Sequence, residues 1–501
     1  MDIASLQVEN EQLRSALAQQ MSRVQQLEEM IRALRQKQFG RSTETTSALQ
    51  IPLFNELDED EELDQAAETE EVSVRGHQRK RRGRPRISDD LPRVEVIHDL
   101  DEADRFCHTH GCSLTPMGEE ISEQLEFIPA KVQVLRHICR KYTCPECEGN
   151  VITAKKPPQP IPKSMATASL LAWIVVSKYM DALPLYRQCE IFKRIGFTAD
   201  RTTLANWMIA CGQLVQPLIN LLWDQLRAQP VIHMDETTVQ VLAEAGRKPD
   251  AKSYMWVAAA GPPTEQVVLF EYHPSRSGQI AQTLLVDYEG TLMVDGYEGY
   301  GPVCTRNGIK RLGCWAHARR GFVEAKRMQP KGKTGRPDQA LVMINKLYGI
   351  ERKLKEVDAQ TRYVARQELA VPVLAQLREW LDKTLPQTAP KTALGKALYY
   401  INAQWQRLIG YTEDGRYPID NNRAENAIRP FVIGRKNWLF SQSVRGAKAS
   451  ANLYSLIETA KANGLEPMDY LMTVFTELPK AQTMEDISAL LPSNIGLGDG
   501  H

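Results

Sequence analysis

Apolar residues recur with a seven-residue period at the start of the chain, over residues 3 to 34. Eight of the ten a and d positions are apolar, and neither proline nor glycine interrupts the seam. This narrow seam favours a coiled coil over a single amphipathic helix packed on its own chain. Asparagine at an a position favours a parallel pair in register. The a positions are Ile3, Asn10, Leu17, Val24 and Ile31, and the d positions are Leu6, Leu13, Gln20, Leu27 and Leu34.

Short apolar runs mark strands in the middle of the chain. Residues 230–234 and 290–294 each predict a buried strand, and each run ends in an aspartate, Asp235 or Asp295. Strands interleaved with a helix predict a mixed α/β sheet. The further predicted strands are residues 237–242, 254–260, 267–272 and 292–294, with a helix within residues 278–288.

The change of pattern along the 501 residues predicts a multidomain α+β protein. A helical block at about 320–412 interrupts the α/β region between its second acid and a third, Glu425. The predicted segments are 1–45 (coiled coil), 46–100 (charged linker), 101–152 (cysteine-rich module), 163–228 (helical), 229–450 (α/β with the insertion) and 451–501 (small helical piece).

Charge is balanced overall but segregated locally. The chain has 62 basic and 62 acidic residues, so its net charge says little about partners. Residues 56–71 hold ten acids and predict a disordered linker, and a basic run follows directly. Within that run a short motif resembles an AT-hook, which enters a narrow minor groove. The alternative is a solvated linker that neutralises the acidic one. The motif consists of Arg82, Gly83, Arg84, Pro85 and Arg86.

No segment has the pattern of a signal peptide or a membrane span. The first residues lack a basic region followed by an apolar core. The most apolar stretch, residues 170–176, is too short to cross a bilayer. We therefore expect a cytosolic protein with no membrane partner.

Four of the nine cysteines form two close pairs within residues 101–152. Such pairs around a hairpin favour a structural Zn²⁺ site, and the metal would supply much of the folding free energy of so small a module. Reduced, buried cysteines are the alternative, which the Cys-x₂-Cys spacing disfavours. The predicted ligands are Cys107, Cys112, Cys144 and Cys147, and nearby substitutes are His108, His110, His137 and Cys139.

The helical region at 163–228 contains a helix over residues 183–195, a break at Gly196 and a second helix over 201–227. Its turn suits a helix-turn-helix, in which one helix enters the major groove of DNA. A helical spacer has the same pattern, so both interpretations stay open.

A basic, aromatic strip follows Glu425 on the same predicted helix and suits contact with DNA phosphates and bases. Cys314 and His317 have the spacing of half a metal site, but no second pair follows in that segment, which favours a structural role. The strip consists of Arg429, Arg435, Lys436 and Trp438.

Several longer motifs occur in a fixed order with the heptads, the basic run and the cysteine pairs. Together they resemble the large transposase of the insertion sequence 66 family of bacteria, over nearly the whole chain. The motifs are QFGRSTE (38–44), KYMDALPLY (178–186), CWAHARR (314–320), NNRAENAIRP (421–430) and ETAKANG (458–464).

The resemblance implies an RNase H-like catalytic domain with a triad of Asp235, Asp295 and Glu425 and a helical insertion before the glutamate. Three acids at one point repel each other unless divalent cations lie between them. Two Mg²⁺ ions suit such a site and can clamp the attacking and leaving oxygens of a phosphodiester.

We therefore expect Mg²⁺-dependent cleavage at the ends of an insertion sequence and transfer of the 3′-hydroxyl into target DNA. The expected partners are double-stranded element ends and target DNA, a second copy of the chain or a higher oligomer, and small accessory proteins of the same element. The expected location is the bacterial cytoplasm, at the nucleoid. The alternatives are a non-catalytic DNA-binding regulator and a nuclease without strand transfer.

Each acid also has a structural interpretation. Asp235 could cap a helix or turn after its strand, but Glu236 and Thr237 continue the extended pattern. Asp295 with the following glycine is a common turn. Asn422 and Glu425 have capping-box spacing, and Glu425 with Arg429 has the spacing of a helical ion pair. The acids that would replace a misassigned member of the triad are Glu236, Glu298 and Asp420.

Overall fold

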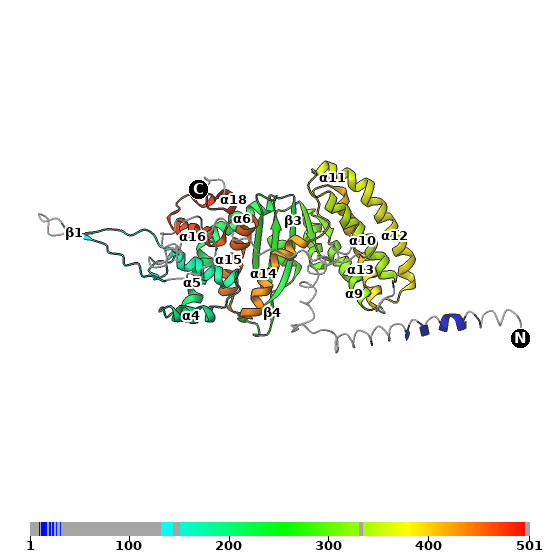
Figure 1. The fold of residues 1–501 in the computed structure, drawn as a ribbon, viewed down its shortest axis with the longest axis horizontal. Coiled ribbons are helices and arrows are strands. Elements are labelled where there is room, and N and C mark those ends of the chain that lie inside the picture. Colours follow the sequence, from blue (N-terminus) through cyan, green and yellow to red (C-terminus); the bar gives the residue numbers. More distant parts are fainter. Residues whose placement is uncertain are drawn as a thin grey trace, which may run out of the picture. The chain divides into compact units, whose positions relative to one another are not determined.

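The computed structural model describes part of the N-terminal segment and most of the chain from residue 132 onward (Figure 1). Among the helices that the structure describes, none combines the length and the hydrophobicity that a membrane span requires. The mixture of helices with one mixed sheet confirms the α+β class. The described residues are 10, 12–17, 20, 21, 23, 24, 27, 31, 132–143, 151–329 and 334–495.

One mixed sheet lies at the centre of the described fold. Its order is β5-β4-β3-β6-β7, and β8 pairs with the far end of β3. The β3-β4-β5 pairs are antiparallel, whereas β6 and β7 run parallel to β3. The strands are β3 (Val231–Ala243), β4 (Lys252–Ala260), β5 (Val267–His273), β6 (Thr291–Val294), β7 (Lys310–Gly313) and β8 (Ser441–Ser443).

β3 is longer than the sequence pattern suggests, because the predicted strands on either side of Asp235 form one strand. β7 was not predicted, since its four residues include Lys310 and Arg311 and lack an apolar run. The helix predicted over residues 201–227 is divided into α5 and α6, with Val215 between them. The turn before α5 contains Gly196 at φ +88°, where a glycine is favoured.

The helices before β3 and after β8 pack together on the β5 side of the sheet. α15 contacts both β5 and α5, and α16 contacts α3 (Figure 1). Asn452 on α15 donates to the carbonyl of Gly212 on α5 at 2.8 Å, so α5 is held within this layer. These helices are α3 (Ala168–Tyr179), α4 (Leu185–Arg194), α5 (Arg201–Leu214), α6 (Gln216–Arg227), α15 (Val444–Ala462), α16 (Pro467–Glu477), α17 (Met484–Ser488) and α18 (Pro492–Ile495).

Polar side chains of α15 complete the hydrogen bonding of the edge strand β5. Thr459 Oγ1 accepts from the N–H of Val268 at 3.0 Å and donates to its carbonyl at 2.9 Å. Ser455 Oγ accepts from the N–H of Phe270 at 2.8 Å. Buried backbone groups need such partners. The motif at 458–464 therefore contains residues that hold this helix against the sheet.

A helical subdomain with its own apolar core lies between β7 and α14. Trp315, Phe322, Ile344 and Leu398 are fully buried in that core. Trp315 Nε1 also donates to the carbonyl of Leu408 at 2.8 Å. Its helices are α9 (Trp315–Arg327), α10 (Arg336–Lys353), α11 (Ala359–Ala365), the π-helix η3 (Arg366–Ala370), α12 (Val371–Thr384) and α13 (Ala393–Ile409).

Two connections that contain three short helices complete the region around the acids. α7 (Gly278–Leu284) joins β5 to β6, and η2 (Glu298–Tyr300) and α8 (Gly301–Asn307) join β6 to β7. After the subdomain, α14 (Asn422–Trp438) returns to pack against β3 and β4 (Figure 1). The chain thus leaves the sheet after β7 and comes back to it with the third acid.

The described residues of the heptad segment are helical, and their apolar side chains are exposed. Leu13 is 64% exposed and Leu17 is 61% exposed in the single chain. In the cysteine-rich module, β1 (Lys141–Thr143) and β2 (Val151–Thr153) form an antiparallel pair. The four predicted zinc ligands and the AT-hook-like motif lie outside the described residues, as do Ile3, Leu6 and Leu34 of the heptads.

Candidate active site

Asp235 and Asp295 come from neighbouring parallel strands. In the β3–β6 pair, His233 lies opposite Met293. Continuing this register by two residues places Asp295, the first residue after β6, beside Asp235. Neighbouring strands are about 4.8 Å apart, and residues in register point to the same face. Two strands thus bring two carboxylates to one place on the sheet.

Backbone N–H groups orient both aspartates. Asp235 Oδ1 accepts from the N–H of Glu236 at 2.8 Å. Asp295 Oδ1 accepts from the N–H of Tyr297 at 2.9 Å. Arg311 holds the turn after β6 by donating to the carbonyls of Asp295 and Tyr297, at 3.0 and 2.7 Å. Each carboxylate is therefore fixed through one oxygen by the local backbone.

Asn421 fixes the helix start that carries Glu425. Its side-chain Nδ2 donates to the carbonyl of Met234 at 2.9 Å, and its Oδ1 lies 3.1 Å from His233 Nδ1. Its backbone N–H donates to Cys314 Sγ at 3.2 Å. Burial lowers the pKa of His233 to about 3, so this imidazole is neutral. One asparagine thus joins β3, the start of α9 and the start of α14.

The first turn of α14 is anchored to the sheet rather than closed by a capping box. The N-cap residue makes no side-chain cap hydrogen bond, and Asn422 is the first helical residue. Arg423 donates instead to the carbonyls of Ala260 and Gly261 at the end of β4, at 2.6 and 2.8 Å. The helix-start explanation therefore does not account for Glu425.

Asp295 and Glu425 lie close enough to Asp235 to affect its ionisation. Burial raises the pKa of Asp235 well above its ordinary value, and the negative charges of Glu236, Glu425 and Asp295 raise it further. Burial beside like charges destabilises the ionised carboxylate. A divalent cation would reverse that penalty, because it favours the charged form of each acid.

Glu236, the fourth acid of this cluster, already has a basic partner. Its side chain is 1% exposed and forms an ion pair with Arg276. It also accepts from the hydroxyl of Tyr300 at 2.5 Å. Arg276 is in turn stacked over the Tyr297 ring, 4.0 Å from its centroid. These contacts distinguish Glu236 from Asp235, although the two are adjacent in sequence.

Glu298 and Asp420, the other two acids that could replace a misassigned member of the triad, have different partners. Glu298 has a side chain that is 70% exposed and pairs with Arg407 at 3.0 Å. Asp420 accepts from the backbone and side-chain N–H groups of Asn422, at 3.1 and 3.0 Å. Neither carboxylate is among the charges that raise the pKa of Asp235.

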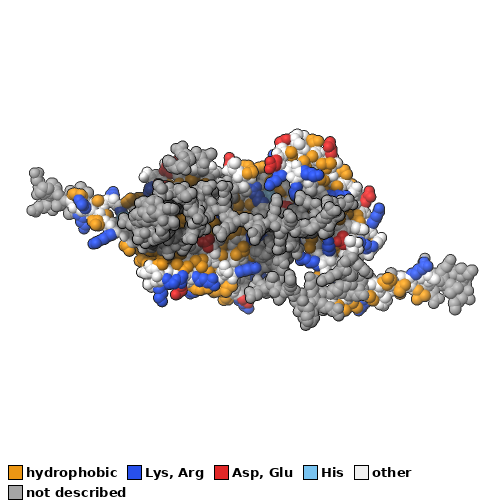
Figure 2. Space-filling view, in the orientation of Figure 1, with side chains coloured by type: hydrophobic (Ala, Val, Ile, Leu, Met, Phe, Trp, Pro, Cys, Tyr) orange, Lys and Arg blue, Asp and Glu red, His pale blue; other side chains and the backbone are white. Residues whose placement is uncertain are grey.

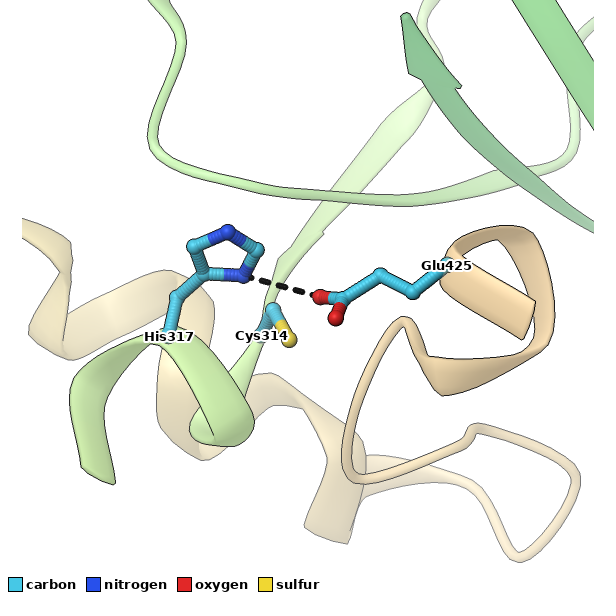
Figure 3. Close-up of side chains that lie close together, drawn as sticks. All are labelled: Cys314, His317 and Glu425. Atoms are coloured by element: carbon cyan, nitrogen blue, oxygen red, sulfur yellow. Dashed lines mark ion pairs between the residues drawn. The ribbon is translucent and has the colours of Figure 1, made fainter. Parts of the chain in front are cut away.

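Glu425 has further partners on α9. Its Oε1 lies 3.2 Å from His317 Nδ1, and its Oε2 accepts from Arg320 at 3.3 Å. Cys314, directly before α9, completes a group whose candidate ligand atoms all lie within 4.8 Å of one another. Figure 3 shows these side chains converging from α9 and α14. The Cys-x₂-His spacing was the only sequence signal for this group, because its third member is distant in the chain.

Arg435, predicted to contact DNA, is buried. It is 8% exposed and donates to the hydroxyls of Thr237 and Thr238 on β3, at 3.1 and 3.2 Å. Burial lowers its pKa to about 10. This guanidinium therefore ties α14 to β3 rather than lying on the surface.

The rest of the predicted basic strip has mixed surroundings. Lys436 is exposed, and Arg429 is half-buried. The Trp438 ring packs against Phe431 with 5.4 Å between centroids, and Lys178 Nζ lies 5.2 Å above the same indole. Trp438 is therefore part of the packing between α14 and α3.

Four family profiles match successive parts of the chain. The profile described as "Transposase IS66 family" covers residues 163–449, and "IS66 C-terminal element" covers 455–493. "Transposase C of IS166 homeodomain" covers 26–96, and "zinc-finger binding domain of transposase IS66" covers 104–148. These matches confirm the resemblance, and they support the leucine zipper and the structural zinc module.

Three proteins of Sinorhizobium fredii (strain NBRC 101917 / NGR234) are similar to the chain. "Uncharacterized protein y4jD" is 34% identical over 436 residues, 84% of each chain. "Uncharacterized protein y4qI" is 31% identical over 84% of this chain and 79% of its own. "Uncharacterized protein y4hP" is 29% identical over 90% and 85%. No solved structure matches the chain.

The order of the four profile matches follows the order of the segments in the sequence. The largest match spans the sheet, the helical subdomain and α14, and thus all three acids. The chain therefore belongs to the IS66 transposase family.

Proposed function

We propose that the protein is a DNA transposase whose Asp235, Asp295 and Glu425 form a divalent-metal site in an RNase H-like domain. The observation that carries the proposal is the joint effect of Glu425 and Asp295 on the ionisation of Asp235. Acids from two adjacent strands and a distant helix have no structural need to meet, and their mutual repulsion destabilises the fold. Perturbed carboxylates of this kind are typical of functional sites.

The donor set fits Mg²⁺. The three acids offer carboxylate oxygens, the hard ligands that Mg²⁺ prefers. When bound, a pair of Mg²⁺ ions supplies charge neutralisation and lowers the pKa of attacking water or hydroxyl. Because Asp235 and Asp295 each use one oxygen for a backbone N–H, the other oxygen of each carboxylate is left for a cation.

The chain's own residues hold this arrangement rigid. Asn421 and Arg423 set the position of the α14 start, and Arg311 fixes the turn after β6. The Arg276 ion pair keeps Glu236 from competing for the same cation. Preorganised ligands of this kind contribute positioning and electrostatic stabilisation of the transition state.

Exposed basic residues on α4 and at the start of α5 suit contact with DNA phosphates. Arg187, Lys193, Arg194 and Arg201 are all exposed. In Figure 2, Lys and Arg side chains gather along the edge where α4 lies. Phosphate contacts of this type give affinity without sequence preference. We propose that this surface, Lys436, Arg429 and the basic run at 82–86 hold the DNA.

The exposed heptad seam supports pairing of two chains. Leu13, Leu17, Val24, Leu27 and Ile31 are each more than half exposed in the single chain. A parallel coiled coil would cover them. Two catalytic domains joined in this way can act on two element ends together.

The test is cleavage of a labelled element end in Mg²⁺. We expect the full-length protein to nick the end and join it to target DNA, and Asp295→Asn to abolish both while retaining end binding in a mobility-shift assay. Asp250→Asn, an exposed acid in the β3–β4 loop, is the control and should cleave normally.

Each outcome distinguishes one class of protein. Normal cleavage by Asp295→Asn would reject the assigned site. Cleavage without joined product would indicate a nuclease. Binding without metal-dependent nicking by the unsubstituted protein would indicate a regulator.

A further inference from the structure

Cys314, His317 and Glu425 form a group of ligand atoms that differs chemically from the all-carboxylate cluster beside it. The group offers one sulfur, one imidazole nitrogen and one carboxylate oxygen, all within 4.8 Å of one another (Figure 3). Three such ligands plus one open position are a common set for Zn²⁺. Ligand atoms around a tetrahedral Zn²⁺ are roughly 3.5 Å apart.

Two atoms of this group lack the hydrogen bond that buried polar atoms normally have. His317 Nδ1 and Glu425 Oε1 lie 3.2 Å apart, yet neither makes a hydrogen bond within the described part of the chain. Glu425 is only 8% exposed. Burial lowers the pKa of His317, which favours the neutral imidazole. A cation between these two atoms would give each of them the partner that buried polar atoms need.

The sulfur of Cys314 also has the surroundings of a ligand. Cys314 is fully buried and immediately precedes α9, so its sulfur lies at the positive end of that helix. Its Sγ accepts the N–H of Asn421 at 3.2 Å. Both features favour the thiolate, but burial and the negative charges of Glu425 and Asp420 outweigh them and raise the pKa of Cys314 well above its ordinary value. A bound divalent cation would reverse this penalty, because it favours the thiolate. On binding, the thiol proton would pass to solvent.

We propose that Cys314, His317 and Glu425 bind a thiophilic divalent cation of the Zn²⁺ class. Because Glu425 is shared, this binding withdraws it from the site that it forms with Asp235 and Asp295. Zn²⁺ at this second site therefore opposes Mg²⁺-dependent cleavage. The binding follows from the geometry alone, whereas the inhibition rests on the function proposed above.

The binding test uses the full-length protein, with Zn²⁺ equivalents measured after dialysis and the thiolate-to-metal absorption band measured with Co²⁺. We expect Cys314→Ala and His317→Gln each to bind one equivalent less than the unsubstituted protein and to lose part of the Co²⁺ band. Cys304→Ala, a half-buried cysteine outside the group, should match the unsubstituted protein. The comparison is independent of the zinc module, because all variants retain it. Equal binding by all four proteins would overturn the proposal.

The inhibition test measures Zn²⁺ sensitivity of Mg²⁺-dependent cleavage, each variant relative to its own rate without added Zn²⁺. We expect the Zn²⁺ concentration for half inhibition to rise at least ~10-fold in Cys314→Ala and in His317→Gln. Unchanged sensitivity in both would overturn the inhibitory role. If no protein cleaves but the difference in bound Zn²⁺ persists, the proposed function fails and the metal site stands.

Discussion

Two buried polar clusters of this protein differ in how their charges are paired. In the helical subdomain, Arg366 is 1% exposed and pairs with Glu351 through two hydrogen bonds of 2.9 and 2.6 Å. Its remaining bonds go to backbone carbonyls at 2.7 to 2.9 Å, those of Tyr411, Asp414 and Tyr417. Every charge in this cluster has a fixed partner.

The acidic cluster on the sheet lacks that balance. Asp235 is surrounded by three other acids that raise its pKa, and Glu425 Oε1 has no hydrogen bond within the described residues. A satisfied buried network stabilises a fold, whereas an unsatisfied one indicates a missing ligand or a functional demand. This contrast supports a structural role for Arg366 and is the reason that we propose a catalytic role for Asp235.

The largest expected effect is on end cleavage, and it distinguishes Glu425 from Glu298. Glu425 lies near Asp295 in space, whereas Glu298 lies near it in sequence. Glu425→Gln should lower Mg²⁺-dependent end cleavage by ~10³-fold or more, because it removes a ligand charge from the site. Glu298→Gln, an exposed acid paired with Arg407, should remain active. A radiolabelled end-cleavage assay measures both. The reverse ranking would show that Glu298 is the third acid.

For the Arg366 cluster, in which every charge is paired, we expect substitution to lower stability rather than cleavage. Arg366→Ala leaves Glu351 and three carbonyls unpaired in the interior and should lower the free energy of unfolding by about 3–5 kcal/mol. Lys480→Ala breaks an exposed ion pair with Glu477 and should have no measurable effect. Urea denaturation followed by tryptophan fluorescence compares the two. Equal effects would remove the distinction between the clusters.

Substitution of Asn421 should affect both cleavage and stability, because this residue positions Glu425 through buried hydrogen bonds. Asn421→Ala should lower the free energy of unfolding by about 1–3 kcal/mol because it leaves the Met234 carbonyl unpaired. Cleavage should also fall, by roughly 10- to 100-fold, from a displaced carboxylate. Asn220→Ala on the exposed face of α6 is the control. Loss of stability with full activity would mean that Asn421 does not position the site.

The smallest effect is a pH dependence of stability without Mg²⁺. The pKa of Asp235 is raised on folding, so the folded chain holds this proton at pH values where the unfolded chain has lost it. Stability therefore decreases as pH rises from about 4 through the raised pKa. Asp235→Asn should reduce the dependence of stability on pH. At pH values above the raised pKa, this variant should have a free energy of unfolding ~1 kcal/mol higher than that of the unsubstituted protein.

Thermal unfolding between about pH 5 and pH 8, in Mg²⁺-free buffer that retains zinc, measures this slope. Adding Mg²⁺ should stabilise the unsubstituted protein more than Asp235→Asn. A slope unaffected by the substitution would contradict crowding of like charges at Asp235.

The sequence predicted the strands that deliver the acids but not how far each strand extends. The apolar runs before Asp235 and Asp295 are strong local signals, and both are strands. β7 has no such signal, because its place is set by parallel pairing with β6 rather than by its own residues. The division of the helix at Val215 is likewise a matter of packing.

Family motifs and local spacing predict only part of the candidate site. The positions of the three acids follow from those motifs. Asn421, Arg320 and Arg276 act through long-range contacts that no spacing records. Arg435 looked like a surface cation in a basic strip, but the fold buries it against β3.

The proposed activity requires that Asp235, Asp295 and Glu425 share divalent cations. A crystal structure of the protein grown with Mn²⁺ in place of Mg²⁺ tests this requirement, because anomalous scattering locates the metal. We expect anomalous density at the carboxylates of Asp235, Asp295 and Glu425. Crystals that contain Mn²⁺ elsewhere but none at these three carboxylates would contradict it.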